Sequence, residues 1–167
     1  MDIKIVDNFL DPIDLKRVVS NLSYKEWSFQ VSDRNDLPGI LISSEVFLMS
    51  DVSDDEFFNS YLYKKLKEHL DGEYELERIY FNGQWSGRES TFHDDACDIT
   101  ALLYVSEYQY GWGGFTEIMT SAAEPTLIHP LQNRLCLFPG RIMHKGYSFS
   151  YQHCPMRISL AFKLNTK

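Results

Sequence analysis

The second half of the chain alternates short apolar segments with turn-forming residues, and this pattern limits the fold more than any other feature. Six segments are rich in β-branched and aromatic side chains, and Gly, Pro and Asn residues separate them. They are residues 73–81, 99–105, 115–120, 126–129, 135–138 and 157–164. Short strands preceded by helices favour a mainly β fold with flanking α-helices, of the sandwich or jelly-roll type.

Two helices are expected before these strands. Asp11 can cap a first helix that begins at Pro12 and continues to about Leu22. A second helix is expected to begin near Ser53–Glu56 and to end at about Leu70. Residues 3–6 and 40–49 are expected to be strands, and residues 31–39 a loop.

Composition and charge narrow the class of protein. The 167 residues suit one domain, expected to span residues 1–167, with 44% hydrophobic residues. The net charge of −8 disfavours binding to nucleic acid. No apolar run is long enough to cross a bilayer, and the first residues lack a signal-peptide pattern. Three cysteines without a CxxC pair predict no disulfide framework, so a cytoplasmic location is expected.

One tripeptide, His93-Asp94-Asp95, has the composition of a metal site. If the segment is extended, His93 and Asp95 point to the same side and Asp94 points away. An imidazole and a carboxylate on one side can share a metal ion. A chain with five histidines and many acidic residues can also contain such a tripeptide by chance.

A second histidine could complete the set. His144 lies 49 residues after Asp95, beyond an expected strand and a Pro-Gly turn. Two histidines and one carboxylate form the facial triad that leaves positions open on non-haem iron(II). The alternative is a loop histidine satisfied by backbone groups.

Period two in the last expected strand separates a polar side from an apolar one. Ile158, Leu160, Phe162 and Leu164 form a core side, whereas Arg157, Ser159, Ala161 and Lys163 form the other. Arg157 lies 13 residues after His144, and its planar guanidinium can bind a carboxylate through two hydrogen bonds. A surface arginine on an edge strand is the alternative.

Taken together, these residues resemble the 2-oxoglutarate/iron(II) oxygenases of the prolyl 4-hydroxylase type, in particular their compact microbial and phage members. The order H-x-D, distal His and Arg is matched by His93, Asp95, His144 and Arg157. Flanking segments are also similar: IVDNFLDPIDLKRVVSNL, IYFNGQWSGRESTFHDD, ALLYVSEYQYGWGGFTEI and NRLCLFPGRIMHKG. Residues 31–72 match least clearly.

The resemblance implies a double-stranded β-helix, a form of jelly roll, with iron(II) held by His93, Asp95 and His144. It also implies that Arg157 binds the 5-carboxylate of 2-oxoglutarate. Tyr104 matches a tyrosine that helps to bind this co-substrate in some members, although it could equally be a core residue. Tyr80 is a similar candidate with less support.

Four residues near these segments are candidates for the mouth of the site and for substrate binding: Trp85, Arg88, Trp112 and Arg141. Each could instead be an ordinary surface residue, and Trp112 belongs to an expected turn with Gly113 and Gly114. Lys163 lies on the same side of this strand as Arg157, but the number of residues between His144 and Arg157 favours Arg157 as the anion ligand. His129 and His153 are not expected to bind metal.

The implied activity is hydroxylation of a C–H bond, with consumption of oxygen and 2-oxoglutarate, release of succinate and carbon dioxide, and ascorbate as a supporting reductant. A prolyl residue in a peptide or protein is the first candidate substrate. A free amino acid or another small molecule is the second, and the acidic balance disfavours an alkylated nucleobase. A jelly-roll module that binds a metal or ligand without turnover is the alternative of another class. The oligomeric state and the substrate are left open.

Overall fold

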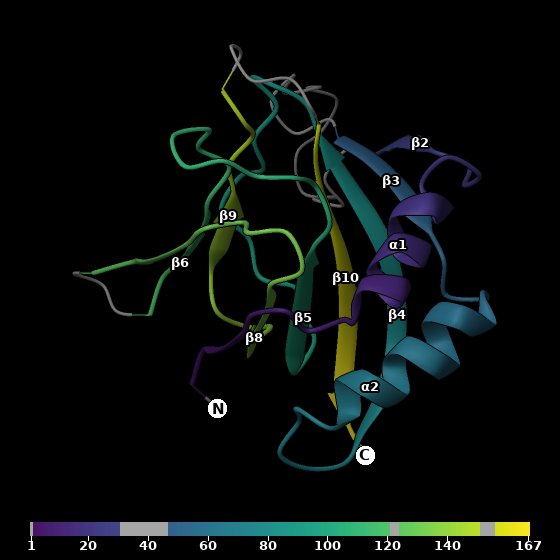
Figure 1. Ribbon diagram of the computed structural model, residues 1–167. Helices are drawn as coiled ribbons and strands as arrows, with labels where there is room; N and C mark the ends of the chain where they lie inside the picture. The colour runs from purple at the N-terminus through teal and green to yellow at the C-terminus, as the bar shows by residue number, and fades with distance from the viewer. Residues whose placement is uncertain (1, 31–46, 121–123, 151–155) are drawn as a thin grey trace.

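The computed structural model describes residues 2–30, 47–120, 124–150 and 156–167, which form two antiparallel sheets with helices on one side (Figure 1). Seven strands form the larger sheet, in the order β1-β8-β5-β10-β4-β3-β2, and three form the smaller sheet, in the order β7-β6-β9. The larger sheet contains β1 (Lys4–Val6), β2 (Ser28–Gln30), β3 (Phe47–Asp51), β4 (Tyr74–Gln84), β5 (Ile99–Tyr104), β8 (Leu135–Pro139) and β10 (Arg157–Thr166). The smaller sheet contains β6 (Thr116–Ile118), β7 (Thr126–Ile128) and β9 (His144–Gly146).

The larger sheet is covered on both faces. In β5 every residue is buried, and Ala101 and Leu103 belong to the core that packs against the helices. Leu102 and Tyr104 belong to a second, smaller core with residues of β6, β7 and β8. Alternate residues of a strand point to opposite faces. The central strands therefore present one face to the helices and the other to the smaller sheet.

The expected period in β10 is confirmed. Leu160, Phe162 and Leu164 are fully buried in the core beneath the helices. Arg157 and Lys163 lie on the opposite face, toward the smaller sheet, where they line a cavity. One face of β10 therefore belongs to the apolar core, and the other face presents two cationic side chains to the cavity.

The first helix agrees with the expectation from the sequence. α1 (Pro12–Asn21) begins after Asp11, whose carboxylate accepts hydrogen bonds from the backbone N–H groups of Ile13 and Asp14. Such a cap satisfies donors that the first turn leaves unpaired. No helix of the described residues is long and apolar enough to span a membrane.

The second helix differs from the expectation in its type and its end. Its first part, η2 (Phe57–Leu62), is a π-helix, and only its second part, α2 (Tyr63–Lys67), is α-helical. The wider π-turn accompanies the burial of two adjacent aromatic residues, Phe57 and Phe58, in the core. Sequence periodicity near 3.6 does not reveal such a local change.

The six strands expected from the sequence are present with shifted ends, and two short strands were missed. β4 extends to Gln84 and β10 to Thr166, so both are longer than expected. The missed strands are β2 and β9, three residues each, and His-Lys-Gly in β9 has no strand-like composition. The expected loop 31–39 and residues 40–46 of an expected strand lie outside the described residues.

Candidate active site

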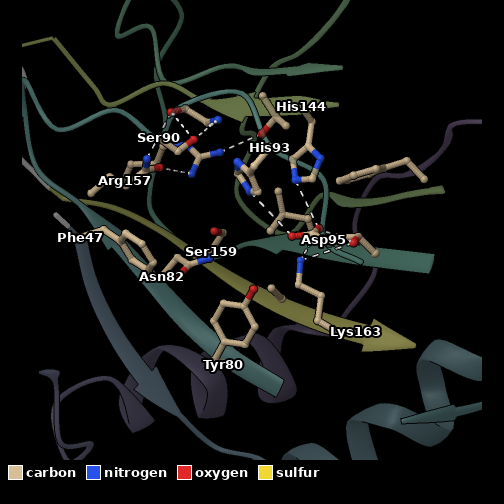
Figure 2. Close-up of a pocket in the computed structure, with 17 residues that line it drawn as sticks. Phe47, Tyr80, Asn82, Ser90, His93, Asp95, His144, Arg157, Ser159 and Lys163 are labelled. Carbon is tan, nitrogen blue, oxygen red and sulfur yellow. Dashed lines mark hydrogen bonds and ion pairs between the residues drawn. The ribbon is translucent and has the colours of Figure 1, made fainter. Parts of the chain in front are cut away.

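A cavity of about 110 Å³ lies between the two sheets (Figure 2). Strands β4, β5, β8 and β10 of the larger sheet, β6 and β9 of the smaller sheet, and the segment before β5 all contribute to its wall. His93, Asp95, His144 and Arg157 all line it. The four residues selected from sequence spacing therefore meet in one place.

Two histidines and one aspartate form a cluster suited to a metal ion. One potential ligand atom from each of His93, Asp95 and His144 lies within 4.8 Å of the others. The Nε2 atom of His93 is 3.7 Å from one carboxylate oxygen of Asp95, and that of His144 is 3.3 Å from the other. This set has the donor composition of a facial triad.

Backbone hydrogen bonds hold the cluster together across 51 positions of sequence, from His93 to His144. The two histidines form an isolated antiparallel bridge, with N–H to C=O distances of 3.0 and 2.9 Å. The N–H of Asp95 also donates to the carbonyl of Gly140, at 2.8 Å. The segment that contains His93 and Asp95 is therefore bonded both to β9, at His144, and to the turn that precedes β9, at Gly140.

Both imidazole rings are oriented for ligation through Nε2. The Nδ1 atom of His93 lies 2.8 Å from the carbonyl oxygen of Thr91, and that of His144 lies 2.9 Å from the carbonyl oxygen of Ile142. A carbonyl only accepts, so each Nδ1 carries a proton, and in the neutral form of each ring Nε2 presents a lone pair. This second contact fixes the tautomer, as in many metal-bound histidines. Burial and the neighbouring His144 lower the pKa of His93, which favours its neutral form.

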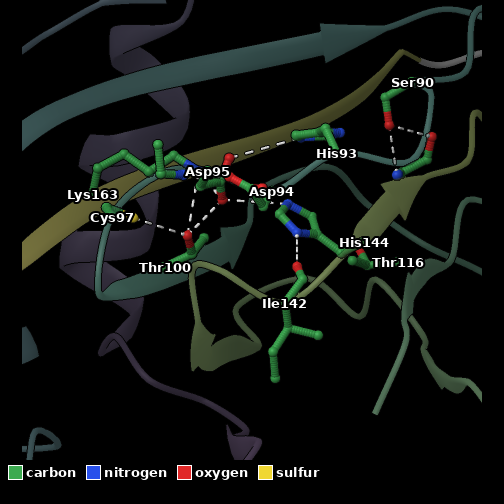
Figure 3. A network of polar contacts seen from close by, with 12 residues as sticks. Ser90, His93, Asp94, Asp95, Cys97, Thr100, Thr116, Ile142, His144 and Lys163 are labelled. Atoms are coloured by element: carbon green, nitrogen blue, oxygen red, sulfur yellow. Dashed lines mark hydrogen bonds and ion pairs between the residues drawn. The ribbon is translucent and has the colours of Figure 1, made fainter. Parts of the chain in front are cut away.

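Asp95 is a buried carboxylate with three partners on one oxygen (Figure 3). Its Oδ2 accepts a hydrogen bond from the Thr100 hydroxyl at 2.5 Å, forms an ion pair with Lys163 and faces His144. Burial raises the pKa of Asp95, but the charge of Lys163 and the contact with His144 outweigh it and hold this pKa far below its usual range. Its other oxygen faces only His93 among the described residues.

Arg157 is a buried cation with neutral partners. Its side chain donates to the Gly114 carbonyl at 2.8 Å, to Gln84 Oε1 at 2.7 Å and to Thr116 Oγ1 at 2.9 Å. The residue is 3% exposed, and no carboxylate of the described residues lies within ion-pair distance of it. A guanidinium has five N–H donors, so two remain for a ligand. Burial lowers the pKa of Arg157, because no anion compensates its charge.

For the Trp112-Gly113-Gly114 turn a structural role was preferred to contact with a ligand, and the structure adds a contact with Arg157 of the site. Gly114 has a φ of +74°, which glycine adopts freely. A Cβ there would lie 2.5 Å from the ring of Phe149. The glycine thus lets its carbonyl oxygen reach the guanidinium of Arg157.

The two candidate tyrosines have different positions. Tyr104 is fully buried, its hydroxyl donates to Thr116 Oγ1 at 2.7 Å, and its ring lies 5.4 Å from the Arg157 guanidinium. It is not among the residues that line the cavity, so it contacts Arg157 and Thr116 from behind. Tyr80 lines the cavity directly, and burial raises the pKa of its phenol.

The four candidates for substrate binding lie outside the cavity wall formed by the described residues. Trp85 packs against Phe29, with the Arg88 guanidinium 5.8 Å from the Trp85 ring centre. Trp112 packs against Phe149. The Arg141 side chain is 70% exposed and lies 3.8 Å from Asp98. His129, not expected to bind metal, contacts the Tyr108 hydroxyl instead, and His153 lies outside the described residues.

Several polar residues of the site were not selected from the sequence. Thr100, Gln84 and Thr116 each hydrogen bond to Asp95 or Arg157, and neutral polar residues in strands carry no distinguishing signal. Asn82 also lines the cavity, and its Oδ1 is the only buried side-chain oxygen or nitrogen of the described residues without a hydrogen-bond partner. An unpaired buried acceptor facing a cavity fits a site that takes a polar ligand.

The fold is similar to that of solved oxygenase structures. One is an oxidoreductase of the 2OG-Fe(II) oxygenase family from Burkholderia pseudomallei, with a TM-score of 0.76 and 10% identity over 98% of this chain and 84% of that one. A second is a prolyl hydroxylase from Trichoplax adhaerens in complex with a hypoxia inducible factor peptide fragment, with a TM-score of 0.73 and 18% identity over 98% and 83%.

A third similar structure is HygX from Streptomyces hygroscopicus with nickel, 2-oxoglutarate and hygromycin B bound, with a TM-score of 0.67 and 9% identity over 99% and 83%. No family model matches the chain, and no curated protein matches it by sequence. The chain therefore has the double-stranded β-helix fold of the 2-oxoglutarate/iron(II) oxygenases, as the resemblance implied, and carries a His-Asp-His cluster that could hold a metal.

Proposed function

We propose that this chain is an iron(II)- and 2-oxoglutarate-dependent dioxygenase that hydroxylates a C–H bond. The observation that carries the proposal is one cavity lined by two kinds of group. It contains a cluster of two histidines and a carboxylate, and a buried arginine that has no counter-charge among the described residues. The cluster provides three ligands and leaves positions for a chelating co-substrate and oxygen. Arg157 provides an anion site in the same enclosure.

The donor set fits iron(II). His93 and His144 would bind the metal through Nε2, since their Nδ1 atoms are engaged with backbone carbonyls. Asp95 would bind through the oxygen that Thr100 and Lys163 do not occupy. Iron bound there would supply the oxygen chemistry, while the protein provides the ligands and their geometry.

The arginine fits the far carboxylate of 2-oxoglutarate. Its two remaining N–H donors can form charge-assisted hydrogen bonds, and its acceptors Gly114, Gln84 and Thr116 fix the plane of the guanidinium. Tyr104 supports this arrangement through its hydrogen bond to Thr116, and we expect no direct contact between Tyr104 and the co-substrate because Tyr104 does not line the cavity. Tyr80 lines the same cavity, where its side chain can limit the volume available to the co-substrate.

The first test is turnover of 2-oxoglutarate. Purified protein with iron(II), ascorbate and 2-oxoglutarate should form succinate, and His144→Ala should form none because the metal loses a ligand. His69→Ala is a matched control, since His69 packs against Phe9 outside the cavity. Equal succinate formation by wild type and His144→Ala would contradict the metal assignment. A wild type that binds metal and co-substrate without turnover would favour a binding module instead.

The proposed substrate is a prolyl residue in a peptide or protein. The similar prolyl hydroxylase with its bound peptide supports this class. The similar HygX structure with hygromycin B supports a second candidate, a small molecule such as a free amino acid. Mass spectrometry of peptide and small-molecule mixtures after reaction decides between them, because only the true substrate gains one oxygen atom. Trp85, Arg88, Trp112 and Arg141 stay candidates for the mouth of the site.

We assign the activity to one domain spanning residues 1–167, working in a reducing compartment such as the cytoplasm. The free, buried thiols of Cys97 and Cys136 support this compartment. The partner classes are a peptide, protein or small molecule, and the acidic charge argues against nucleic acid.

A further inference from the structure

A second cation, Lys163, is built into the wall of the same cavity. It lies on β10, on the same face as Arg157, and is 8% exposed. The register of β10 and β5 pairs Lys163 with Thr100, so the two side chains are neighbours on the cavity face. A lysine in this setting is unusual because a buried ammonium is costly unless it is paired.

The partners of Lys163 fix its ammonium beside a proposed metal ligand. Nζ forms an ion pair with Asp95 Oδ2 and lies 3.4 Å from Thr100 Oγ1. The ring of Tyr80 lies 5.7 Å away, which gives the ammonium an aromatic neighbour. Asp95 is its only carboxylate partner among the described residues, so the charge cannot move to another anion there.

We propose that Lys163 is a fixed internal charge that weakens binding of the divalent metal and strengthens binding of the dianionic co-substrate. The inference rests on the proposed function, since it assumes that His93, Asp95 and His144 hold the metal. Lys163 acts through Asp95 and through the field in the cavity, so it is a positioning residue rather than a catalytic one.

Lys163 should affect the two affinities in opposite directions because the metal is a cation and the co-substrate is an anion. A divalent metal with Asp95 leaves one net positive charge, and Lys163 adds a second a few ångströms away. Repulsion between close like charges in a partly desolvated site exceeds the gain from one hydrogen bond to a carboxylate. The same added charge attracts a ligand that carries two negative charges.

Isothermal titration of Mn(II), and then of 2-oxoglutarate at saturating Mn(II), tests the inference without turnover. Lys163→Met should bind Mn(II) about tenfold more tightly and 2-oxoglutarate about tenfold more weakly than wild type. Lys163→Gln retains an N–H donor without charge and should behave like Lys163→Met. Lys163→Arg retains the charge and should stay close to wild type. Lys64→Met, an exposed lysine of α2, is the control and should change neither affinity.

Other outcomes overturn the inference in distinguishable ways. Weaker binding of both ligands in Lys163→Met and Lys163→Gln would indicate a merely structural role. Wild-type affinities in Lys163→Gln with altered ones in Lys163→Met would show that the hydrogen bond matters and the charge does not. A wild type that binds no Mn(II) would instead contradict the proposed function on which the inference rests.

Discussion

The two buried cations of β10 lie six residues apart on one face of one strand, yet they have opposite surroundings. Arg157 has three neutral acceptors and no carboxylate partner among the described residues, whereas Lys163 is paired with Asp95. A buried charge without a counter-charge is costly, so the end of the cavity at Arg157 is prepared for an anion that arrives as a ligand. The end at Lys163 already contains its anion, which the proposed metal would share.

The largest expected effect comes from removing the charge of Asp95, at the Lys163 end of the cavity. Asp95→Asn leaves the Lys163 ammonium buried beside a neutral amide, and loss of one partner of a buried ion pair costs about 3 kcal/mol or more. We expect a loss of this size in the free energy of unfolding of the metal-free protein, measured by urea denaturation with a chelator present. The double variant Asp95→Asn/Lys163→Gln should recover most of it. Equal stability of the single and double variants would show that Lys163 does not depend on Asp95.

The next largest effect should come from replacing Arg157, at the other end of the cavity. Arg157→Met removes the charge and both free donors, so affinity for 2-oxoglutarate should fall about 100-fold, equivalent to about 2.7 kcal/mol. Affinity for Mn(II) should not fall, because Arg157 contacts none of the three proposed ligands. Calorimetric titration of Mn(II), followed by titration of 2-oxoglutarate at saturating Mn(II), measures the two affinities. An unchanged affinity for 2-oxoglutarate would place the anion elsewhere, and Lys163 would be the next candidate.

A smaller effect should follow from the support behind Arg157. Thr116 accepts hydrogen bonds from both Arg157 and Tyr104, so Thr116→Val should weaken 2-oxoglutarate binding about tenfold. Tyr104→Phe removes only the indirect contact and should weaken it about threefold. The same titrations measure this order. A larger loss in Tyr104→Phe than in Thr116→Val would indicate direct contact between Tyr104 and the co-substrate.

The smallest effect concerns pH. Burial and the nearby His144 lower the pKa of His93 from its ordinary value of 6.5, so His93 stays neutral to a lower pH than a free histidine. Metal binding requires the neutral ring, so the decline in Mn(II) binding caused by protonation of His93 should be centred below pH 6.5. Titrations between pH 8 and pH 5.5 check this, and a decline attributable to His93 that is centred above pH 6.5 would contradict it.

Local patterns predicted those parts of the fold and site that depend on periodicity. Period two in residues 157–164 separated Arg157 and Lys163 from the core, and the i, i+2 spacing of His93 and Asp95 selected Asp95 over Asp94. In the structure Asp94 is exposed, and its carboxylate accepts from the backbone N–H of Ala96.

Features that depend on tertiary contacts could not be predicted. The short β9 exists because His144 pairs with both Ile118 and His93, and neither pairing leaves a mark in the local sequence. The ion pair between Lys163 and Asp95 depends on how the segment before β5 folds back toward β10. The preference for Arg157 over Lys163 as the anion ligand rested on the number of residues from His144. The counter-charge of Lys163, and the absence of one for Arg157 among the described residues, depend on tertiary contacts that the sequence does not show.

The central claim is that the metal cluster and Arg157 bind one ligand in one cavity, and the metal dependence of 2-oxoglutarate binding tests it most directly. Calorimetry should detect binding of 2-oxoglutarate to the Mn(II)-loaded protein. This binding should become at least about tenfold weaker when a chelator removes the metal. His144→Ala should show the weaker binding even with Mn(II) present. Binding of equal strength with and without the metal, or no binding to a protein that holds Mn(II), would contradict the account.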